Sequence, residues 1–67
     1  MKTLAKTLGS RIVELRMKRG LTAERLAQEM QISKGYLSDI ENGKKLPTIA
    51  MLARLAKVLK FPLREFF

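Results

Sequence analysis

Residues that begin and end helices recur at short intervals along this sequence, and they restrict it to short helices. Thr22, Ser33 and Thr48 are good N-cap residues, each followed by apolar residues at helical spacing. Gly20 and the pair Asn42-Gly43 are strong stop signals. These signals predict helices over about residues 4–19, 23–30, 34–42, 49–59 and 63–66. Since no segment alternates polar and apolar residues as a strand does, we expect an all-α fold with five helices.

The apolar positions of these helices predict one small core. In the first helix they follow one another at spacings of four, four and three residues, which forms a single stripe. That stripe consists of Leu4, Leu8, Ile12 and Leu15. Gly9 interrupts it at a cost of about 1 kcal/mol relative to Ala, which leaves the start of the helix open. A chain of 67 residues forms a single domain, residues 1–67, and Met1 suggests a natural start.

The residue types that are absent exclude most enzyme and metal chemistry. The chain has no Cys and no His, which removes disulfides, thiol nucleophiles, imidazole bases and the usual zinc ligands. Its six Asp and Glu residues are spread along the chain and form no paired-acid site. No apolar run approaches the roughly 20 residues of a membrane span. We therefore expect a small intracellular binding domain with no catalytic residue, no metal and no cofactor.

The net charge of +8 indicates a polyanionic partner. Residues 1–34 carry eight basic and three acidic side chains, and residues 35–67 carry six and three, so the whole domain is basic. Such a field favours DNA, RNA or an anionic membrane, although a charged surface can also serve solubility alone. A membrane-active cationic peptide is a further alternative, but the repeated caps and turns favour a folded core.

The second and third expected helices are separated by three residues, which is the helix-turn-helix pattern. The most specific strings are LTAERLA at residues 21–27 and ISKGYLSDIENGKKLPT at residues 32–48. They resemble the Cro/C1-type (XRE-like) helix-turn-helix family of phage and bacterial repressors, and the resemblance covers about Leu8 to Phe66. It implies a five-helix, lambda-repressor-like DNA-binding domain whose third helix lies in the major groove.

The resemblance implies that the outward face of this recognition helix reads bases. The expected base-reading residues are Lys34, Gly35, Ser38 and Asp39. Lys34 can donate to guanine O6 or N7, and Asp39 can accept from a cytosine amino group or exclude wrong sites by its charge. The alternative for Asp39 is an ion pair with a neighbouring Lys. Gly35 has no side chain, so its role would be close approach of the backbone to the DNA.

Phosphate contacts are expected from donors on both sides of the recognition helix. The expected residues are Arg16, Thr22, Ala23, Ser33, Tyr36, Asn42, Lys44 and Lys45. The amides at the start of the second helix, near Thr22 and Ala23, form an anion site. Lys44 and Lys45 follow the recognition helix, where they could equally form a solvated turn. Ser33 is more securely a cap than a DNA contact.

By the same resemblance, Arg16 forms a structural pair with Glu41 that ties the recognition helix to the first helix and turns the guanidinium toward a phosphate. The alternative is two unrelated surface charges. The sequence departs from the family pattern at two positions. Ala23 stands where many members have a Gln that touches phosphate, and Gln31 stands where many have Gly, so a left-handed Gln31 would carry strain.

The C-terminal stretch concentrates apolar residues beyond what one short helix can bury, and an exposed apolar patch often marks an interface. The expected dimer-interface residues are Phe61, Leu63, Phe66 and Phe67. A two-fold homodimer would place two recognition helices about 34 Å apart on a palindromic operator. The alternative is that all the Phe side chains are buried within the monomer.

Together these features predict a cytoplasmic, nucleoid-associated, sequence-specific double-stranded DNA-binding transcriptional regulator. We expect a dimeric repressor or autoregulator, of the kind found among phage repressors, restriction-modification controller proteins and antitoxins. The alternative is a protein-interaction adaptor or antitoxin-type module that uses the same fold to bind a protein partner, with DNA binding secondary. Neither interpretation requires an enzyme activity or a membrane.

Overall fold

Four α-helices and a final 3-10 turn make up the computed structural model, which describes residues 3–67. The helices are α1 (Leu4–Lys18), α2 (Ala23–Met30), α3 (Lys34–Glu41) and α4 (Ile49–Leu59), followed by the 3-10 helix η1 (Leu63–Phe66). The all-α prediction is therefore confirmed, with a single 3-10 turn as the fifth helix. Met1, where we expect the chain to start, lies outside the described residues. Arg19 and Asn42 are C-caps rather than the last residues of α1 and α3.

Hydroxyl side chains begin every α-helix. Thr3, Thr22, Ser33 and Thr48 each accept a hydrogen bond from the backbone amide three residues later, over distances of 3.0–3.2 Å. Each such cap stabilises its helix by about 1 kcal/mol relative to Ala. Short helices of this kind are only marginally stable alone, so the caps and the packing together decide where each helix begins.

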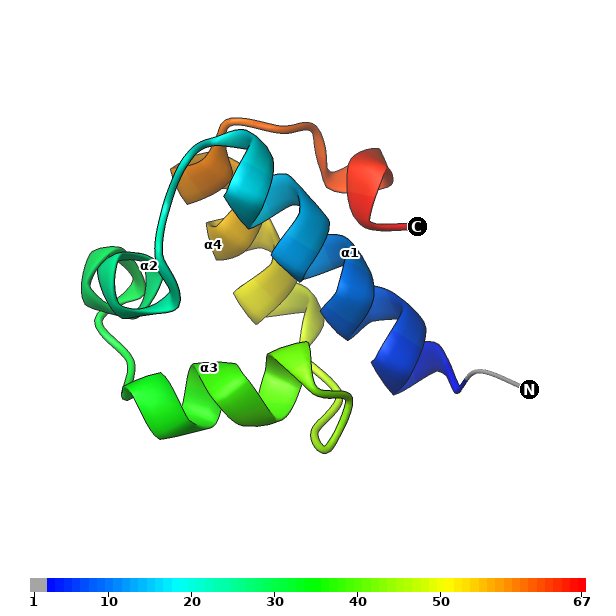
Figure 1. Ribbon diagram of the computed structural model, residues 1–67. Helices are drawn as coiled ribbons and strands as arrows, with labels where there is room; N and C mark the ends of the chain where they lie inside the picture. Colours follow the sequence, from blue (N-terminus) through cyan, green and yellow to red (C-terminus); the bar gives the residue numbers. More distant parts are fainter. Residues whose placement is uncertain (1–2) are drawn as a thin grey trace.

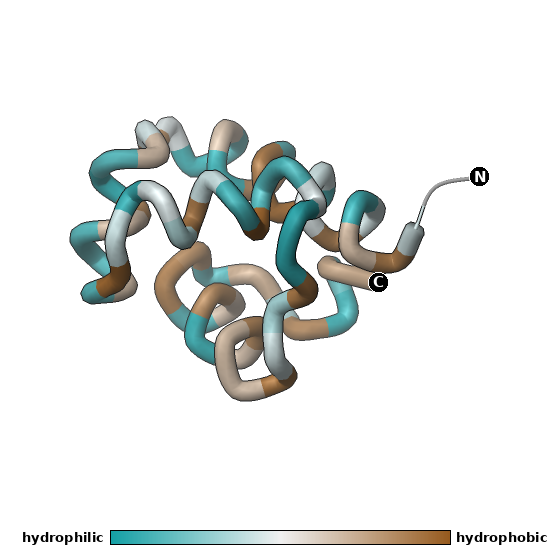
Figure 2. Tube along the Cα trace, turned by 90° about the horizontal axis from the view of Figure 1, so that it is seen from below, coloured by the Kyte–Doolittle hydropathy of each residue, from teal (hydrophilic) through white to brown (hydrophobic). Residues whose placement is uncertain are grey.

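The helices surround one apolar core. In Figure 1, α1 and α4 cross the middle of the molecule, α2 lies at one side, α3 runs along the lower edge, and η1 returns to α1. The hydropathy view in Figure 2 shows hydrophobic and hydrophilic positions interleaved along the helices, as expected when one side of each helix is buried. The buried apolar residues are Leu8, Ile12, Leu15, Leu26, Ala27, Met30, Leu37, Ile40, Leu52, Leu55, Leu59 and Phe66.

Phe66 completes this core from η1, which packs against α1 and α4. Its side chain is only 1% exposed, which corrects the expectation that it contributes to a dimer interface. Its neighbour Phe67 is 68% exposed and Leu63 is 38% exposed. The 3-10 turn therefore directs Phe66 into the core and leaves Leu63 and Phe67 exposed to solvent.

Gly9 lies where α1 passes closest to the end of α3. A Cβ atom at this position would lie 2.4 Å from the Ile40 carbonyl oxygen and 2.7 Å from the Glu41 carbonyl oxygen. Both oxygens belong to the backbone, so they cannot rotate away as a flexible side chain could. The sequence shows Gly9 only as a weak position in a helix, whereas the structure shows that its missing side chain sets the distance between α1 and α3.

The turn between α2 and α3 contains the strained residue expected from the sequence. Gln31 adopts the left-handed conformation, with φ 57° and ψ 42°, which costs roughly 1–2 kcal/mol for a residue with a Cβ. The Ile32 amide donates to the Ala27 carbonyl at 3.0 Å and closes α2. Arg54 of α4 donates to the Met30 carbonyl, so a cation also holds the C-terminal end of α2. These contacts fix the angle at which α3 leaves the turn.

Candidate nucleic-acid interface

The outer side of α3 lies at an edge of the molecule (Figure 1) and carries most of the expected base-reading residues. Leu37 and Ile40 are fully buried and hold the helix to the core. Lys34, Gly35 and Ser38 are exposed. A helix held by its apolar side, with an open polar side of two turns, has the shape that fits a major groove about 12 Å wide.

Lys34 does not extend freely into solvent. Its Nζ lies 3.0 Å from Glu24 Oε2 on α2, and the two side chains are 62% and 64% exposed. The hydrogen bond from Lys34 lowers the pKa of Glu24, with a further contribution from the charge of Lys34, so the carboxylate is ionised at neutral pH. Spacing along the sequence does not reveal Glu24 as the partner of Lys34, because the two residues are ten positions apart on different helices.

The other end of this helix face is also held by local contacts. Lys45 Nζ lies 3.5 Å from Asp39 Oδ2 and 5.3 Å from the centre of the Tyr36 ring. Asn42 Nδ2 donates to Ser38 Oγ at 3.2 Å. In the protein without DNA, Asp39 therefore forms an ion pair with Lys45, as the alternative interpretation expected. Asp39 is half-buried, while Lys45 and Asn42 remain exposed.

The expected phosphate-binding residues flank α3 on both sides. Thr22 is exposed and caps α2, whereas Ala23 is half-buried and packs against the core. Ser33 is exposed, and it uses its hydroxyl oxygen to cap α3. Beyond α3, the Lys44 amide donates to the Asp39 carbonyl at 2.8 Å, which folds the loop back and leaves the Lys44 side chain exposed.

The structure brings Arg16 and Glu41 together across α1 and α3. Arg16 Nε lies 2.8 Å from Glu41 Oε2, and Nη2 lies 3.4 Å from Oε1. Nη1 donates to the Leu21 carbonyl at 2.8 Å. The side chains of the pair are only 14% and 9% exposed, so little water screens them. Three of the five guanidinium N–H groups are used in these contacts.

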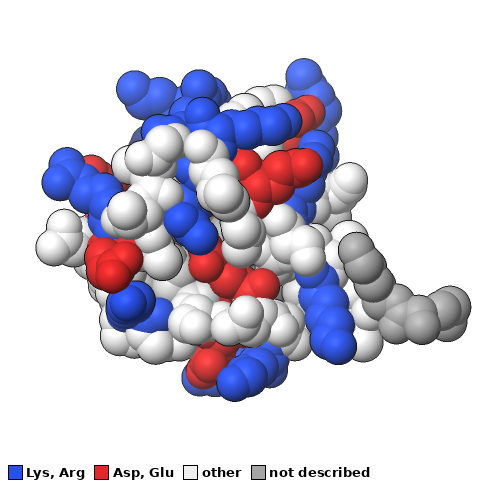
Figure 3. All heavy atoms as spheres, in the orientation of Figure 1, with Lys and Arg blue, Asp and Glu red and all other residues white. Residues whose placement is uncertain are grey.

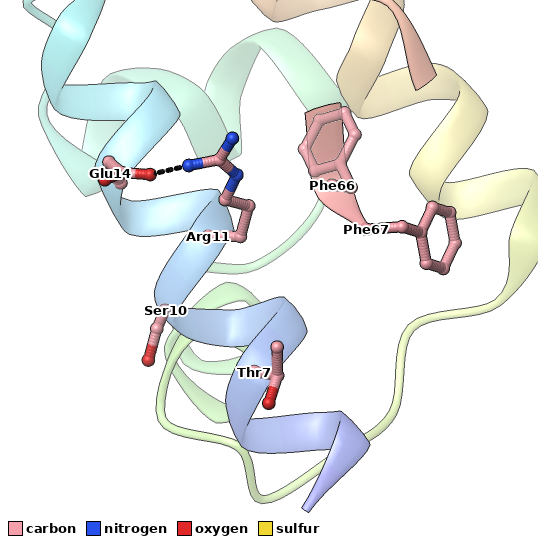
Figure 4. Close-up of a pocket in the computed structure, with 6 residues that line it drawn as sticks. All are labelled: Thr7, Ser10, Arg11, Glu14, Phe66 and Phe67. Atoms are coloured by element: carbon pink, nitrogen blue, oxygen red, sulfur yellow. Dashed lines mark hydrogen bonds and ion pairs between the residues drawn. The ribbon is translucent and has the colours of Figure 1, made fainter. Parts of the chain in front are cut away.

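Two of the expected interface residues at the C-terminus, Phe66 and Phe67, line a shallow pocket of about 200 Å³ against α1 (Figure 4). Arg11 lies across it, pairs with Glu14 and donates to the Glu65 carbonyl. In the close-up, the Phe67 ring projects away from Arg11. Phe61 is half-buried beneath the Arg19 guanidinium, whose Cζ lies 4.2 Å from the ring centre.

Several cations hold the fold together rather than serving only as surface charges. Arg19 Nε donates to the Leu59 carbonyl at 2.7 Å, and Nη2 donates to the Lys60 carbonyl at 2.8 Å. Arg19 therefore satisfies carbonyl groups at the end of α4, and Arg54 of α4 satisfies the Met30 carbonyl at the end of α2. The sequence gives no sign of these pairings, because the partners are 24 to 41 residues away. Figure 3 shows Lys and Arg spread over the visible face, with Asp and Glu between them.

Neither a metal-binding cluster nor a membrane-spanning helix occurs among residues 3–67. Within residues 3–67, no three His, Cys, Asp or Glu side chains come together as a metal site would need. None of the helices described has the length and apolar composition required to cross a bilayer.

Comparison with known proteins gives consistent matches over nearly the whole chain. The helix-turn-helix family model HTH_3 matches residues 12–66. The HTH-type transcriptional regulator SutR of Escherichia coli (strain K12) is 36% identical over 66 residues, which are 98% of this chain and 37% of SutR. The ImmF control region 10 kDa protein of Bacillus phage phi105 is 38% identical over 58 residues, which are 87% of this chain and 64% of that protein. The chain thus spans only part of the length of these relatives.

Two solved structures share the fold. The clp gene regulator ClgR from Corynebacterium glutamicum superposes with a TM-score of 0.93 at 29% identity, over 98% of this chain and 86% of that chain. The restriction-modification controller protein C.AhdI from Aeromonas hydrophila superposes with a TM-score of 0.87 at 30% identity, over 94% of this chain and 96% of that chain. With a family model that covers most of its length, the chain belongs to the HTH_3 helix-turn-helix family, whose relatives named here include transcriptional regulators.

Proposed function

We propose that this protein is a sequence-specific double-stranded DNA-binding transcriptional regulator that places α3 in the major groove. The observation that carries the proposal is the two-sided character of α3. Leu37 and Ile40 fix the helix in the core, while Lys34, Gly35 and Ser38 face solvent. The net charge of +8 supplies the sequence-independent attraction that brings such a surface to DNA.

In this proposal the residues divide by what they contact. Lys34 donates to guanine, Asp39 and Ser38 meet bases further along the helix, and Gly35 lets the backbone approach the DNA. Phosphates are bound by the exposed cations of the loop after α3 and by the start of α2. The proposed phosphate contacts are Arg16, Thr22, Ala23, Ser33, Tyr36, Asn42, Lys44 and Lys45. For Ala23 the contact is limited to its backbone amide, because its side chain packs against the core.

The proposed operator complex is a two-fold homodimer on a palindromic site. The proposed contact uses the exposed Leu63 and Phe67 and the half-buried Phe61, and it does not need Phe66. An isologous contact there would set two copies of α3 about one helical turn of DNA apart. We propose repression or autoregulation as the outcome, acting at the nucleoid in the cytoplasm, without a catalytic step. The same apolar residues support the second candidate, a docking site for a protein partner.

Selection of bound sites from random duplexes tests this function, followed by titration of the best site against salt. The expected result is a palindromic consensus and a steep loss of affinity as salt rises. Lys34→Ala should relax selection at one base pair in each half-site. Lys57→Ala is the matched control, since Lys57 is an exposed cation on α4. Absence of any consensus would refute the proposal. If the protein still self-associates and binds a protein partner independently of salt, the second candidate, a protein-interaction adaptor, would be favoured.

A further inference from the structure

One side of α1 lies against the C-terminal end of α3 and the loop that follows it (Figure 1). Three positions of α1 make this contact, and their spacings of three and seven residues place them on one face of the helix. Gly9 meets the last carbonyl groups of α3, Arg16 pairs with Glu41, and Lys6 meets Gly43. The first turns of α1 therefore border the loop to which we assign phosphate contacts.

Lys6 packs directly on the backbone of this loop. A Cβ atom on Gly43 would lie 2.5 Å from Lys6 Cγ and 2.9 Å from Lys6 Cα, so the close approach depends on the glycine. Lys6 is nevertheless exposed. A Lys side chain whose stem packs on the protein keeps its ammonium group in water. The ammonium group of Lys6 therefore lies at the surface beside the loop.

The charge of Lys6 is available to an anionic partner. Within residues 3–67, Lys6 takes part in none of the ion pairs. Lys45 of the loop, by contrast, lies 3.5 Å from Asp39 Oδ2, which partly balances its charge. The phosphates of one DNA strand follow one another about every 3.4 Å along the helix axis, so a strand held by the loop presents further phosphates next to it.

We propose that Lys6 is a further DNA-contacting residue, which binds a phosphate next to the one held by the loop after α3. This inference rests on the proposed DNA-binding function. The contact carries no information about bases, because it is made to the strand backbone, and it serves to fix the position of α1 and α3 on the duplex. A different role for the same cation is to stabilise the C-terminal end of α3, and this role needs no DNA.

The chain provides a matched control on the same helix. Lys6→Met removes the charge and keeps an unbranched stem that can still pack on Gly43. Lys18→Met makes the same change at an exposed Lys twelve residues further along α1, about 18 Å away at 1.5 Å per residue. That separation exceeds the Debye length of about 10 Å at 0.1 M salt, so Lys18→Met measures the general effect of losing one positive charge.

The test measures the affinity of wild type and both variants between 50 and 200 mM salt. The probes are the selected duplex and the same duplex with the guanine read by Lys34 replaced. We expect Lys6→Met to reduce the slope of log K against log salt by about 0.9 for each bound copy of the protein. The loss of affinity over this salt range should therefore be about 3-fold smaller for each copy. Both duplexes should lose affinity by the same factor, and Lys18→Met should keep the slope of wild type.

Lys6→Arg separates a phosphate contact from a packing role. It restores the charge, so the slope should return to that of wild type, and thermal melts should show that all the variants are folded. A slope that Lys6→Arg does not restore, or a discrimination between the two duplexes that falls in Lys6→Met, would overturn the inference. If wild type discriminates and Lys6→Met has the slope of Lys18→Met, only the inference fails. If wild type shows no preference between the duplexes, the proposed function itself is wrong.

Discussion

Replacement of Gly9 by Ala tests the packing that holds the recognition helix to the rest of the domain. On helix propensity alone, Ala in the interior of α1 should stabilise the protein by about 1 kcal/mol. The structure predicts the opposite sign. The new Cβ would lie 2.4 Å from one backbone carbonyl oxygen of α3 and 2.7 Å from the next, far inside van der Waals contact.

The magnitude follows from these two opposing effects. Overpacking of a tight contact costs about 1–3 kcal/mol, and two backbone atoms that cannot rotate away favour the upper part of that range. After subtraction of the propensity gain, we expect Gly9→Ala to lower the free energy of unfolding by about 1–2 kcal/mol. For a domain of this size, that lowers Tm by about 4–16 °C.

Gly35→Ala is the matched control, because it is also a helical Gly and a Cβ there meets nothing within 4 Å. It should raise Tm by a few degrees, since only the propensity gain remains. Thermal unfolding followed by circular dichroism measures both variants. A Tm for Gly9→Ala that rises as much as that for Gly35→Ala would refute this account of the α1–α3 contact. On the proposed operator, Gly35→Ala should nevertheless bind more weakly, because its methyl group lies on the DNA-facing side.

Three further perturbations give distinct expected outcomes. Glu41→Ala leaves the largely buried Arg16 without its carboxylate, so it should lower the free energy of unfolding by about 2–3 kcal/mol. The same variant should weaken operator binding. An unchanged thermal melt would contradict this prediction. The lowered pKa of Glu24 means that its pairing stabilises the protein at neutral pH and loses that effect as the pH falls through the lowered value, below the ordinary 4.5. The Tm values of wild type and Glu24→Gln should therefore converge between pH 7 and pH 3, and a constant difference would count against the pair. Phe66→Ala should cost about 3–5 kcal/mol in urea unfolding, whereas Phe67→Ala should leave monomer stability nearly unchanged and weaken self-association in sedimentation experiments.

The sequence predicts the helices well because local chemistry sets their ends. Thr22, Ser33 and Thr48 cap helices in the structure as they do in the sequence pattern. The two faces of α3 also follow from spacing alone, since Leu37 and Ile40 repeat at the interval of one helical turn. These features depend on residues a few positions apart, which a single sequence displays directly.

The remaining features depend on contacts that spacing does not encode. Gly9 and the Ile40 carbonyl are brought together only when α1 crosses α3. Lys34 contacts Glu24 because the α2–α3 turn brings the two helices together at the observed angle. Arg19 hydrogen-bonds to the Leu59 carbonyl at the end of α4, forty residues away. Phe66 and Phe67 are neighbours with the same side chain, yet a 3-10 turn sends one into the core and the other into solvent.

An NMR titration of the ¹⁵N-labelled protein with its selected duplex tests whether α3 is the element that reads DNA. If α3 enters the major groove, the largest amide shift changes will occur along α3, in the loop containing Lys44 and Lys45, and at the start of α2. The amides of α4 beside Lys57 should change little. Shift changes concentrated on η1 and the C-terminal end of α4, with α3 unaffected, would contradict the claim that α3 is the DNA-reading element.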